Sequence, residues 1–277
     1  MALTFAVVAA VLLGASDFLA ARAARTAPSI SVARTAIGVS SLLAPLVVLF
    51  VHFEVVLRDL VISGCAGLAM TTGLALLYRG YAIARMGVVA PMSSVLLASV
   101  PVLFDLVRGE RPSAVGAAGM AIGLVALVLT SYHRGGTGSV SLGAMLGIAS
   151  GVAFGIAFTL MGEVSEASGL LPVLTQRWAG FAMLALISVR GADPFFVTTR
   201  TERKAAFAAG AFAMVAIASL QLGFQNGASG PVAVATSQFA TVAVILSVIF
   251  NRERMRWWQG IGVGATAIGV SLMALGG

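Results

Sequence analysis

Apolar stretches recur along the whole chain, from Leu3 to Leu275, and no segment between them is polar enough to form a separate soluble domain. Of the 277 residues, 59% are hydrophobic and only 10% are charged. Soluble domains are about 25% charged. The sequence therefore excludes a water-soluble globule and predicts a protein that lies in a lipid bilayer.

The bounds of these stretches predict ten membrane-spanning helices. A helix needs roughly 20 mostly apolar residues to cross the hydrocarbon layer. Charges, prolines and glycine clusters place the spans near 3–22, 30–51, 60–79, 88–107, 113–132, 141–163, 170–189, 205–226, 231–250 and 256–275. Runs such as Val115–Leu129 are apolar on every face, unlike the strands of a β-barrel. We therefore predict an all-α integral membrane protein, and we expect the first span to be retained because it lacks a basic start.

A shift of 143 residues superposes the two halves of the chain. It aligns Arg34 with Arg177, Leu77 with Leu220, Gly80 with Gly223, Tyr81 with Phe224, Gly87 with Gly230, Glu110 with Glu253, Arg111 with Arg254 and Gly119 with Gly262. Each copy would contain five spans, an odd number, so the second copy must enter the membrane in the opposite orientation. The sequence thus predicts two inverted five-helix repeats, 1–132 and 141–277, joined by a linker at 133–140. Many secondary transporters are built in this way.

The formal net charge of +7 comes from basic residues that are spread singly through short loops. This distribution fits lipid headgroups and membrane topology better than nucleic acid. Loops after odd-numbered spans carry twelve basic residues and the other loops carry three, which favours both termini outside the cytoplasm. The expected partners are a small-molecule substrate and the bilayer of the cell membrane. A monomer is the simplest expectation, although the sequence leaves the oligomeric state open.

Enzyme and cofactor motifs are absent from the sequence. Cys65 is the only cysteine, and His52 and His133 lie near the ends of expected helices. No HExxH, aspartate-rich pair, serine–histidine arrangement or P-loop is present. We therefore expect no metal, no cofactor and no enzymatic activity. A membrane-embedded enzyme stays the least favoured alternative, and a structural or sensor protein without transport is another.

Three charged side chains fall well inside the expected spans, namely Asp17, Arg34 and Arg177. A charge at membrane depth is costly, so it normally faces the protein interior and a partner. Asp17 and Arg34 would lie at similar depth and are expected to form an ion pair. Glu163 is the expected partner of Arg177. Arg177 should face the interior, where its guanidinium would either bind a substrate carboxylate or form a fixed structural bridge.

Further polar residues inside the spans are candidate substrate contacts. Gln221 and Gln225 are four residues apart and so share one helix face. The full candidate set for substrate binding is Arg34, Tyr78, Tyr81, Ser94, Arg177, Gln221, Gln225 and Gln238. Each of the uncharged ones, taken singly, is better explained as a hydrogen bond between helices than as a ligand contact. Together they are typical of a cavity for a small amphipathic molecule.

Several local patterns resemble the EamA family of the drug/metabolite transporter superfamily. They are the turn Arg108-Gly109-Glu110-Arg111-Pro112-Ser113, its counterpart Asn251-Arg252-Glu253-Arg254, the opening Gly14-Ala15-Ser16-Asp17-Phe18, and the segment 77–91. The counterpart turn departs from Gly-Glu-Arg at its glycine. The resemblance covers essentially the whole chain.

The resemblance implies a ten-helix secondary carrier that moves small organic metabolites, often as an exporter or exchanger of amino-acid-like or drug-like compounds. It implies no particular substrate. Many family members have both termini in the cytoplasm, which conflicts with the count of basic residues, so the orientation stays open. The distantly similar small multidrug resistance proteins exchange protons at a carboxylate in their first helix, which makes Asp17 the candidate for proton coupling. An ion pair with Arg34 would hold Asp17 ionised and argue against that role.

Overall fold

The computed structural model describes residues 1–109, 113–131, 138–188, 193–227, 229–251 and 257–276. These residues form helices and connecting turns, and they contain no strand. The helices are α1 (Ala2–Ala24), α2 (Ser29–Val48), α3 (Leu57–Ile83), α4 (Met86–Val107), α5 (Ala114–Ser131), α6 (Gly138–Gly162), α7 (Leu171–Ser188), α8 (Arg200–Gln225), α9 (Ser229–Thr236), α10 (Phe239–Asn251) and α11 (Trp257–Gly276), with a short 3₁₀ turn at Glu166–Ser168.

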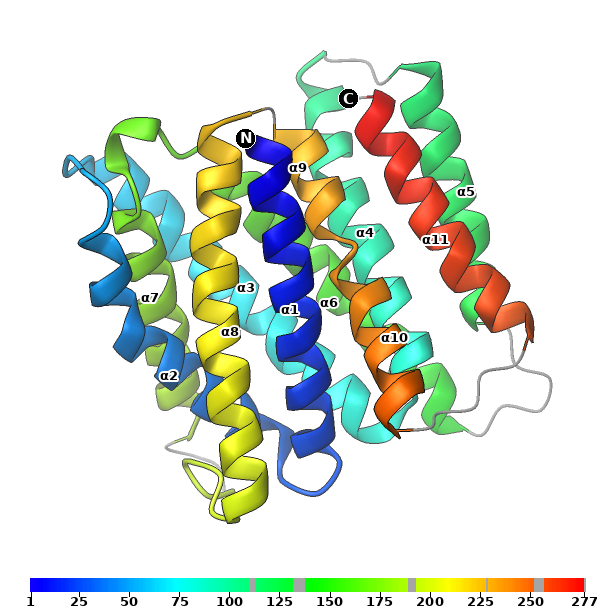
Figure 1. Ribbon diagram of the computed structural model, residues 1–277, viewed down its shortest axis with the longest axis horizontal. Coiled ribbons are helices and arrows are strands. Elements are labelled where there is room, and N and C mark those ends of the chain that lie inside the picture. The colour runs from blue at the N-terminus through cyan, green and yellow to red at the C-terminus, as the bar shows by residue number, and fades with distance from the viewer. Residues whose placement is uncertain (110–112, 132–137, 189–192, 228, 252–256, 277) are drawn as a thin grey trace.

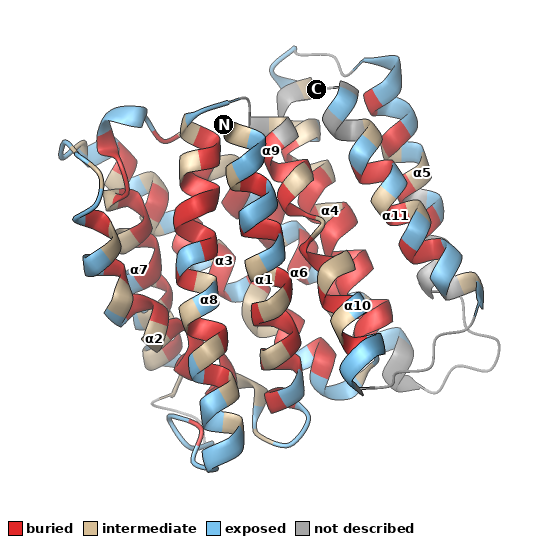
Figure 2. Ribbon diagram, in the orientation of Figure 1, coloured by how far each residue is buried: buried red, intermediate tan, exposed pale blue. Residues whose placement is uncertain are grey.

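The helices have the length and apolar surface that a bilayer requires. Within the described residues, eight stretches are long and apolar enough to cross a membrane, and α5 and α11 each contain a shorter apolar stretch. Exposed positions recur along the length of the helices (Figure 2). Many of the exposed side chains are large and hydrophobic, such as Leu42, Val125 and Ile249. In water this exposure would be unfavourable, whereas in lipid it carries no cost. The prediction of an all-α membrane protein with about ten spans is confirmed.

The expected ninth span, 231–250, is wrong in one respect, because it consists of two helices. α9 ends at Thr236 and α10 begins at Phe239. At the break, the Ser237 hydroxyl donates to the Val234 carbonyl at 2.7 Å, and the Gln238 amide donates to the Ala267 carbonyl of α11 at 3.3 Å. Neighbouring carbonyls thus accept hydrogen bonds from Ser237 and Gln238, whereas the buried Thr236 hydroxyl has no partner among the described residues.

The expected linker, 133–140, stays a prediction. α6 begins at Gly138, so residues 138–140 are helical, and residues 132–137 lie outside the described part of the chain. The repeated Glu-Arg turns, at 110–111 and 253–254, lie outside it too. The helix bounds nevertheless follow the shift of 143 residues. α3 begins at Leu57 and α8 at Arg200, and α4 begins at Met86 and α9 at Ser229.

The helices of the two halves are interleaved. α8 packs against α1 and α2, and α9 and α10 pack against α1; we call these five helices the α1 bundle. α3 packs against α6 and α7, and α4 packs against α6; we call these four helices the α6 bundle. The shift of 143 residues converts one set of pairings into the other. α5 and α11, which also correspond, pack against each other at one edge of the molecule (Figure 1).

Close packing inside the α6 bundle depends on the glycines that recur every fourth residue along α6. A Cβ atom on Gly147 would lie 2.7 Å from the Val89 carbonyl oxygen, and one on Gly155 would lie 2.5 Å from the Val100 Cβ. Only hydrogen fits at these contacts with α4. This ridge of glycines therefore serves helix packing.

The molecule has two distinct ends. Both termini lie at one end, which we call the terminal end (Figure 1). The α1–α2, α3–α4 and α7–α8 connections lie at the opposite end, which we call the basic end because Arg22, Arg25, Arg85 and Arg203 are found there. The direction of each helix therefore determines which of the two ends a given residue lies nearer to.

Candidate transport site

A small cavity lies between the two bundles, near the middle of the helices that form it. Its volume is about 40 Å³. That is room for about three water molecules. The lining residues come from eight helices: Leu13, Ser16, Asp17, Ala36, Ile37, Ser40, Met70, Leu74, Tyr78, Leu97, Phe154, Phe158, Arg177, Ala213, Ile217 and Phe239.

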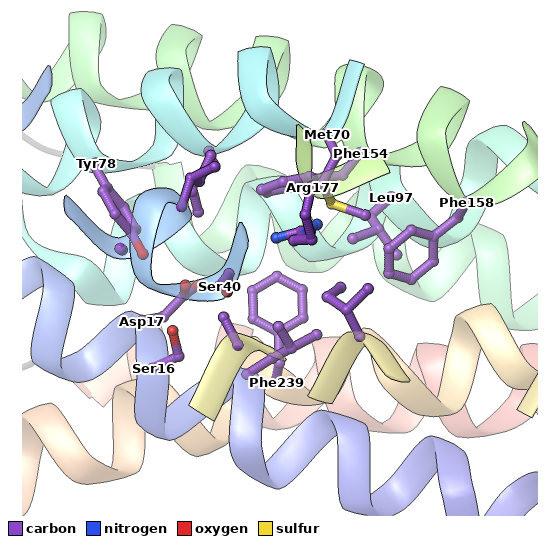
Figure 3. Close-up of a pocket in the computed structure, with 16 residues that line it drawn as sticks. Ser16, Asp17, Ser40, Met70, Tyr78, Leu97, Phe154, Phe158, Arg177 and Phe239 are labelled. Carbon is purple, nitrogen blue, oxygen red and sulfur yellow. The ribbon is translucent and has the colours of Figure 1, made fainter. Parts of the chain in front are cut away.

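The cavity has a polar part and an apolar part (Figure 3). Ser16, Asp17 and Tyr78 lie toward one side, Leu97 and Phe158 lie toward the other, and Arg177 points into the space between them. Asp17 is seven residues from the basic end of α1, whereas Phe158 is four residues from the terminal end of α6. The polar part is therefore nearer the basic end, and the apolar part is nearer the terminal end.

Asp17 is held in the cavity wall by a tyrosine of the other bundle. Its side chain is buried, and its Oδ2 accepts a hydrogen bond from the Tyr81 hydroxyl at 3.2 Å. The expected Asp17–Arg34 ion pair is wrong. The Arg34 guanidinium donates to the Ser188 hydroxyl at 2.6 Å and to the Ile30 carbonyl at 3.3 Å, and it lies 5.2 Å from the centre of the Phe195 ring. Arg34 thus joins α2 to α7 and the segment after it.

Arg177 lines the cavity and has unused donors. It is only 5% exposed, and its Nη2 donates to the Gln176 side-chain oxygen at 2.9 Å. Its Nε has no partner among the described residues. The expected ion pair with Glu163 is wrong, because both Glu163 carboxylate oxygens bind Arg108, at 2.6 and 3.0 Å, at the terminal end. Sequence reasoning missed Arg108 as a partner because α4 and α6 are not adjacent in sequence.

The cavity therefore contains one acidic and one basic side chain that do not pair with each other. Among the described residues, no salt bridge includes Asp17 or Arg177. A buried charge without a counter-charge is unfavourable. A ligand that brought one positive and one negative group would give each of them an opposite charge while keeping the cavity neutral.

The structure brings together three of the nine candidate residues, namely Asp17, Tyr78 and Arg177. Tyr81 lies behind Asp17, with its ring centre 6.4 Å from that of Tyr78. The others lie outside the cavity lining. The Ser94 hydroxyl donates to the Pro91 carbonyl at 3.1 Å, and the Gln225 amide donates to the Gly169 carbonyl at 2.7 Å.

Three more of the nine also lie outside the lining. They are Arg34, Gln238 in the α9–α10 break, and Gln221. Gln221 is fully buried, and neither of its side-chain polar atoms has a hydrogen-bond partner in the described part of the chain. For the candidates outside the lining, a role in substrate binding therefore stays a prediction.

Sequence reasoning missed the apolar lining. Met70, Leu97, Phe154, Phe158 and Phe239 form most of the apolar wall. Nothing in the sequence distinguishes them from the apolar residues that face lipid. Ser16 and Ser40 were missed for a related reason, because their hydroxyls donate to the Ala209 and Gly210 carbonyls of α8 and so resemble ordinary interhelical bonds.

The side chains that line the site suit the binding of charged organic groups. Within the described residues, no three His, Cys, Asp or Glu side chains are placed to hold a metal ion. Arg177 carries several N–H donors in a planar fork, which matches the geometry of a carboxylate. Asp17 offers an acceptor for an ammonium group.

Residues 141–275 match the sequence model described as the EamA-like transporter family. The second half of the chain, residues 141–275, is therefore similar to EamA-like transporters. This match confirms the resemblance noted in the sequence over residues 141–275, and the family suggests a membrane transporter of the drug/metabolite type. No curated protein matches the chain. A solved structure described as "Crystal structure of protein" superposes with a TM-score of 0.72 over 99% of this chain and 96% of that one, at 17% identity, which supports the fold alone.

Proposed function

We propose that this EamA-like protein is a secondary transporter of small amphipathic zwitterions such as amino acids. The observation that carries the proposal is the presence of Asp17 and Arg177 in one cavity without an ion pair between them. The Arg177 guanidinium would bind the carboxylate of the substrate, and Asp17 would bind its ammonium group. The apolar part of the cavity, with Leu97 and Phe158, would receive an apolar side chain.

The two bundles supply the moving parts of this proposal. At the terminal end, the rings of Phe158 in α6 and Phe224 in α8 meet edge to face, with centres 5.8 Å apart. Nearer the basic end, Tyr81 in α3 donates to Asp17 in α1. Each contact joins one bundle to the other. Separating the bundles at one end while keeping contact at the other would open the cavity to one side only, which is alternating access.

The cavity volume of about 40 Å³ fits a closed conformation within this cycle. A ligand pocket for a metabolite usually measures roughly 300 Å³ or more. The bundles must therefore separate before an amino acid can enter. Several of the contacts between them are aromatic rings or single hydrogen bonds, which are worth about 1 kcal/mol each and are readily exchanged.

Asp17 is the residue that we propose for ion coupling. Its carboxylate bonds to Tyr81 in this conformation, and it would exchange that partner for a substrate ammonium group or a proton. In the cell membrane, such a carrier would work as an exporter or an exchanger. The sidedness of the basic residues supports an orientation with the basic end in the cytoplasm.

Counterflow into proteoliposomes tests the proposal. Vesicles loaded with unlabelled L-leucine, L-methionine and L-phenylalanine should accumulate the radiolabelled forms through the wild-type protein. Protein-free vesicles are the control for leak, and the variant Asp17→Asn with Arg177→Gln is the control for the site. Absence of counterflow for all three amino acids, with folded protein in tight vesicles, would contradict the proposal.

A further inference from the structure

The cavity is lined by one stripe of residues from each half of the chain. On α3 the stripe is Met70, Leu74 and Tyr78, and on α8 it begins with Ala213 and Ile217. The shift of 143 residues converts Met70 into Ala213, Leu74 into Ile217 and Tyr78 into Gln221. Residues four apart lie on the same face of a helix. Gln221 therefore completes the α8 stripe one turn beyond Ile217.

The two stripes run in opposite directions because α3 and α8 do. α3 runs toward the basic end and α8 runs toward the terminal end (Figure 1). Tyr78 therefore lies at the basic-end side of the cavity, and Gln221 lies at its terminal-end side. Tyr78 lines the cavity directly, whereas Gln221 is outside its lining.

Gln221 is a polar residue in a buried position that offers it no hydrogen bond. Its side chain is 0% exposed, and neither the amide nitrogen nor the amide oxygen has a partner among the described residues. Leaving a buried polar group without a hydrogen bond is unfavourable. An apolar residue of similar size would fit this position better if helix packing were its only role. Ser219, two residues away, is also buried, so polarity alone is tolerated on this helix.

An aromatic pair stands at the terminal-end side of the cavity. Phe158 lines the cavity, and its ring meets Phe224, which is three residues beyond Gln221 on α8. Phe224 is the equivalent of Tyr81 under the same shift. Tyr81 likewise makes a contact between the bundles near the basic end. Equivalent residues thus close the two sides of the cavity, one with a hydrogen bond and one with a ring contact.

From these placements we propose that Gln221 is a second substrate contact, located behind the Phe158–Phe224 ring pair and used when the transporter opens toward the terminal end. The inference rests on the proposed transport function. The amide nitrogen would donate to the carboxylate of the zwitterion, and the amide oxygen would accept from its ammonium group. Tyr78 would be the corresponding contact toward the basic end, so that the two residues mark the two halves of one path.

Sided cysteine labelling tests the path without a substrate. In a Cys65→Ala background, which has no other cysteine, Gln221→Cys and Tyr78→Cys are exposed to a charged, membrane-impermeant maleimide added to one face of the membrane. Gln221→Cys should react only from the terminal end, and Tyr78→Cys only from the basic end. A minor conformation is usually populated at roughly 0.1–10%. If the cysteines react only in such an open state, their labelling rates should be that fraction of the labelling rate of an exposed marker cysteine.

Control positions make the labelling result decisive. Glu54→Cys and Lys204→Cys are exposed markers for the terminal and basic ends, and Ser150→Cys, on α6 and buried against α4, should not react from either face. Reaction of the Gln221 and Tyr78 variants from the same face, or no reaction of Gln221→Cys from the terminal end, would overturn the inference.

A transport measurement separates a substrate contact from a packing role. Gln221→Leu removes both unpartnered atoms, so its melting temperature should equal or exceed that of the wild type. Its KM for L-leucine should nevertheless rise about tenfold from the terminal end and stay unchanged from the basic end. Ser219→Ala is the matched control and should change neither value. Unchanged KM on both faces would assign Gln221 to packing, whereas a wild-type protein that moves no amino acid would instead refute the proposed function.

Discussion

Replacement of Arg177 by glutamine should separate binding from stability. The Arg177 side chain is 5% exposed, makes one hydrogen bond to Gln176, and has an Nε without a partner among the described residues. Two charge-assisted hydrogen bonds to a substrate carboxylate would be worth about 1.5–3 kcal/mol each. After allowance for the hydration that the carboxylate gives up, roughly 3 kcal/mol remains, which corresponds to about a hundredfold in KM.

Arg177→Gln should therefore raise the KM for L-leucine about a hundredfold in the counterflow assay. Its melting temperature should not fall, because the substitution removes a buried charge that has no counter-charge. Arg177→Lys keeps the charge but loses the planar fork, so its KM should rise about tenfold. An unchanged KM in folded Arg177→Gln would refute the assignment of this guanidinium to the substrate.

Arg34 provides the matched control for this prediction, since it is the repeat equivalent of Arg177. Its guanidinium bonds to Ser188 and to a backbone carbonyl and stacks on Phe195, away from the cavity. Arg34→Gln should lower the melting temperature and leave the KM of the remaining folded protein unchanged. The opposite pattern, an intact melting temperature with a raised KM, would show that the two arginines have been assigned the wrong roles.

Three further predictions concern packing, a loop anchor and the cavity carboxylate. Gly151→Leu should prevent folding, because its Cβ would collide with the backbone of α4. Gly260→Leu is the control, because no atom lies within 4 Å of the position of its Cβ, and this variant should give a normal yield of folded protein in size-exclusion chromatography. Asp59 is 0% exposed and accepts hydrogen bonds from Ser165 and Ser168, which anchor the loop after α6. Asp59→Asn should therefore lower the free energy of unfolding by about 3 kcal/mol, and with it the melting temperature, without changing KM. A normal melting temperature would contradict this anchoring role. Tyr81→Phe removes a hydroxyl that competes with the substrate for the Asp17 carboxylate. Calorimetry should therefore find a Kd for L-leucine that is about two- to tenfold lower than that of the wild type. A higher Kd would contradict the proposal that Asp17 exchanges Tyr81 for the substrate.

The helices were predictable because each span must supply about twenty mostly apolar residues to cross the hydrocarbon layer. Residues 57–83 and 200–225 are long, apolar and bounded by charges or turn residues, and both form single helices. The α9–α10 break was not predictable, because Ser237 and Gln238 interrupt an apolar run without proline or glycine between the two helices. Whether a short polar step breaks a helix depends on tertiary partners, and here the Gln238 amide finds a carbonyl on α11.

The candidate site was predictable in its charges and unpredictable in its partners. A charged residue at membrane depth must face the interior, which was enough to select Asp17 and Arg177. Depth alone does not decide which neighbour a side chain meets. Arg34 lies near the depth of Asp17, yet it turns to Ser188 on α7, and Glu163 turns to Arg108, which directly follows α4. Helices that are distant in sequence supplied both partners.

Competition among three molecules of nearly the same shape tests whether Asp17 and Arg177 together recognise a zwitterion. L-leucine carries both charges, 4-methylpentanoate lacks the ammonium group, and 3-methylbutylamine lacks the carboxylate. Each is titrated against counterflow of radiolabelled L-leucine through the wild-type protein. Unlabelled L-leucine should compete at least about tenfold more strongly than either singly charged analogue, because each lost ion contact is worth about 1.5 kcal/mol or more. Equal competition by either analogue would contradict recognition by both residues.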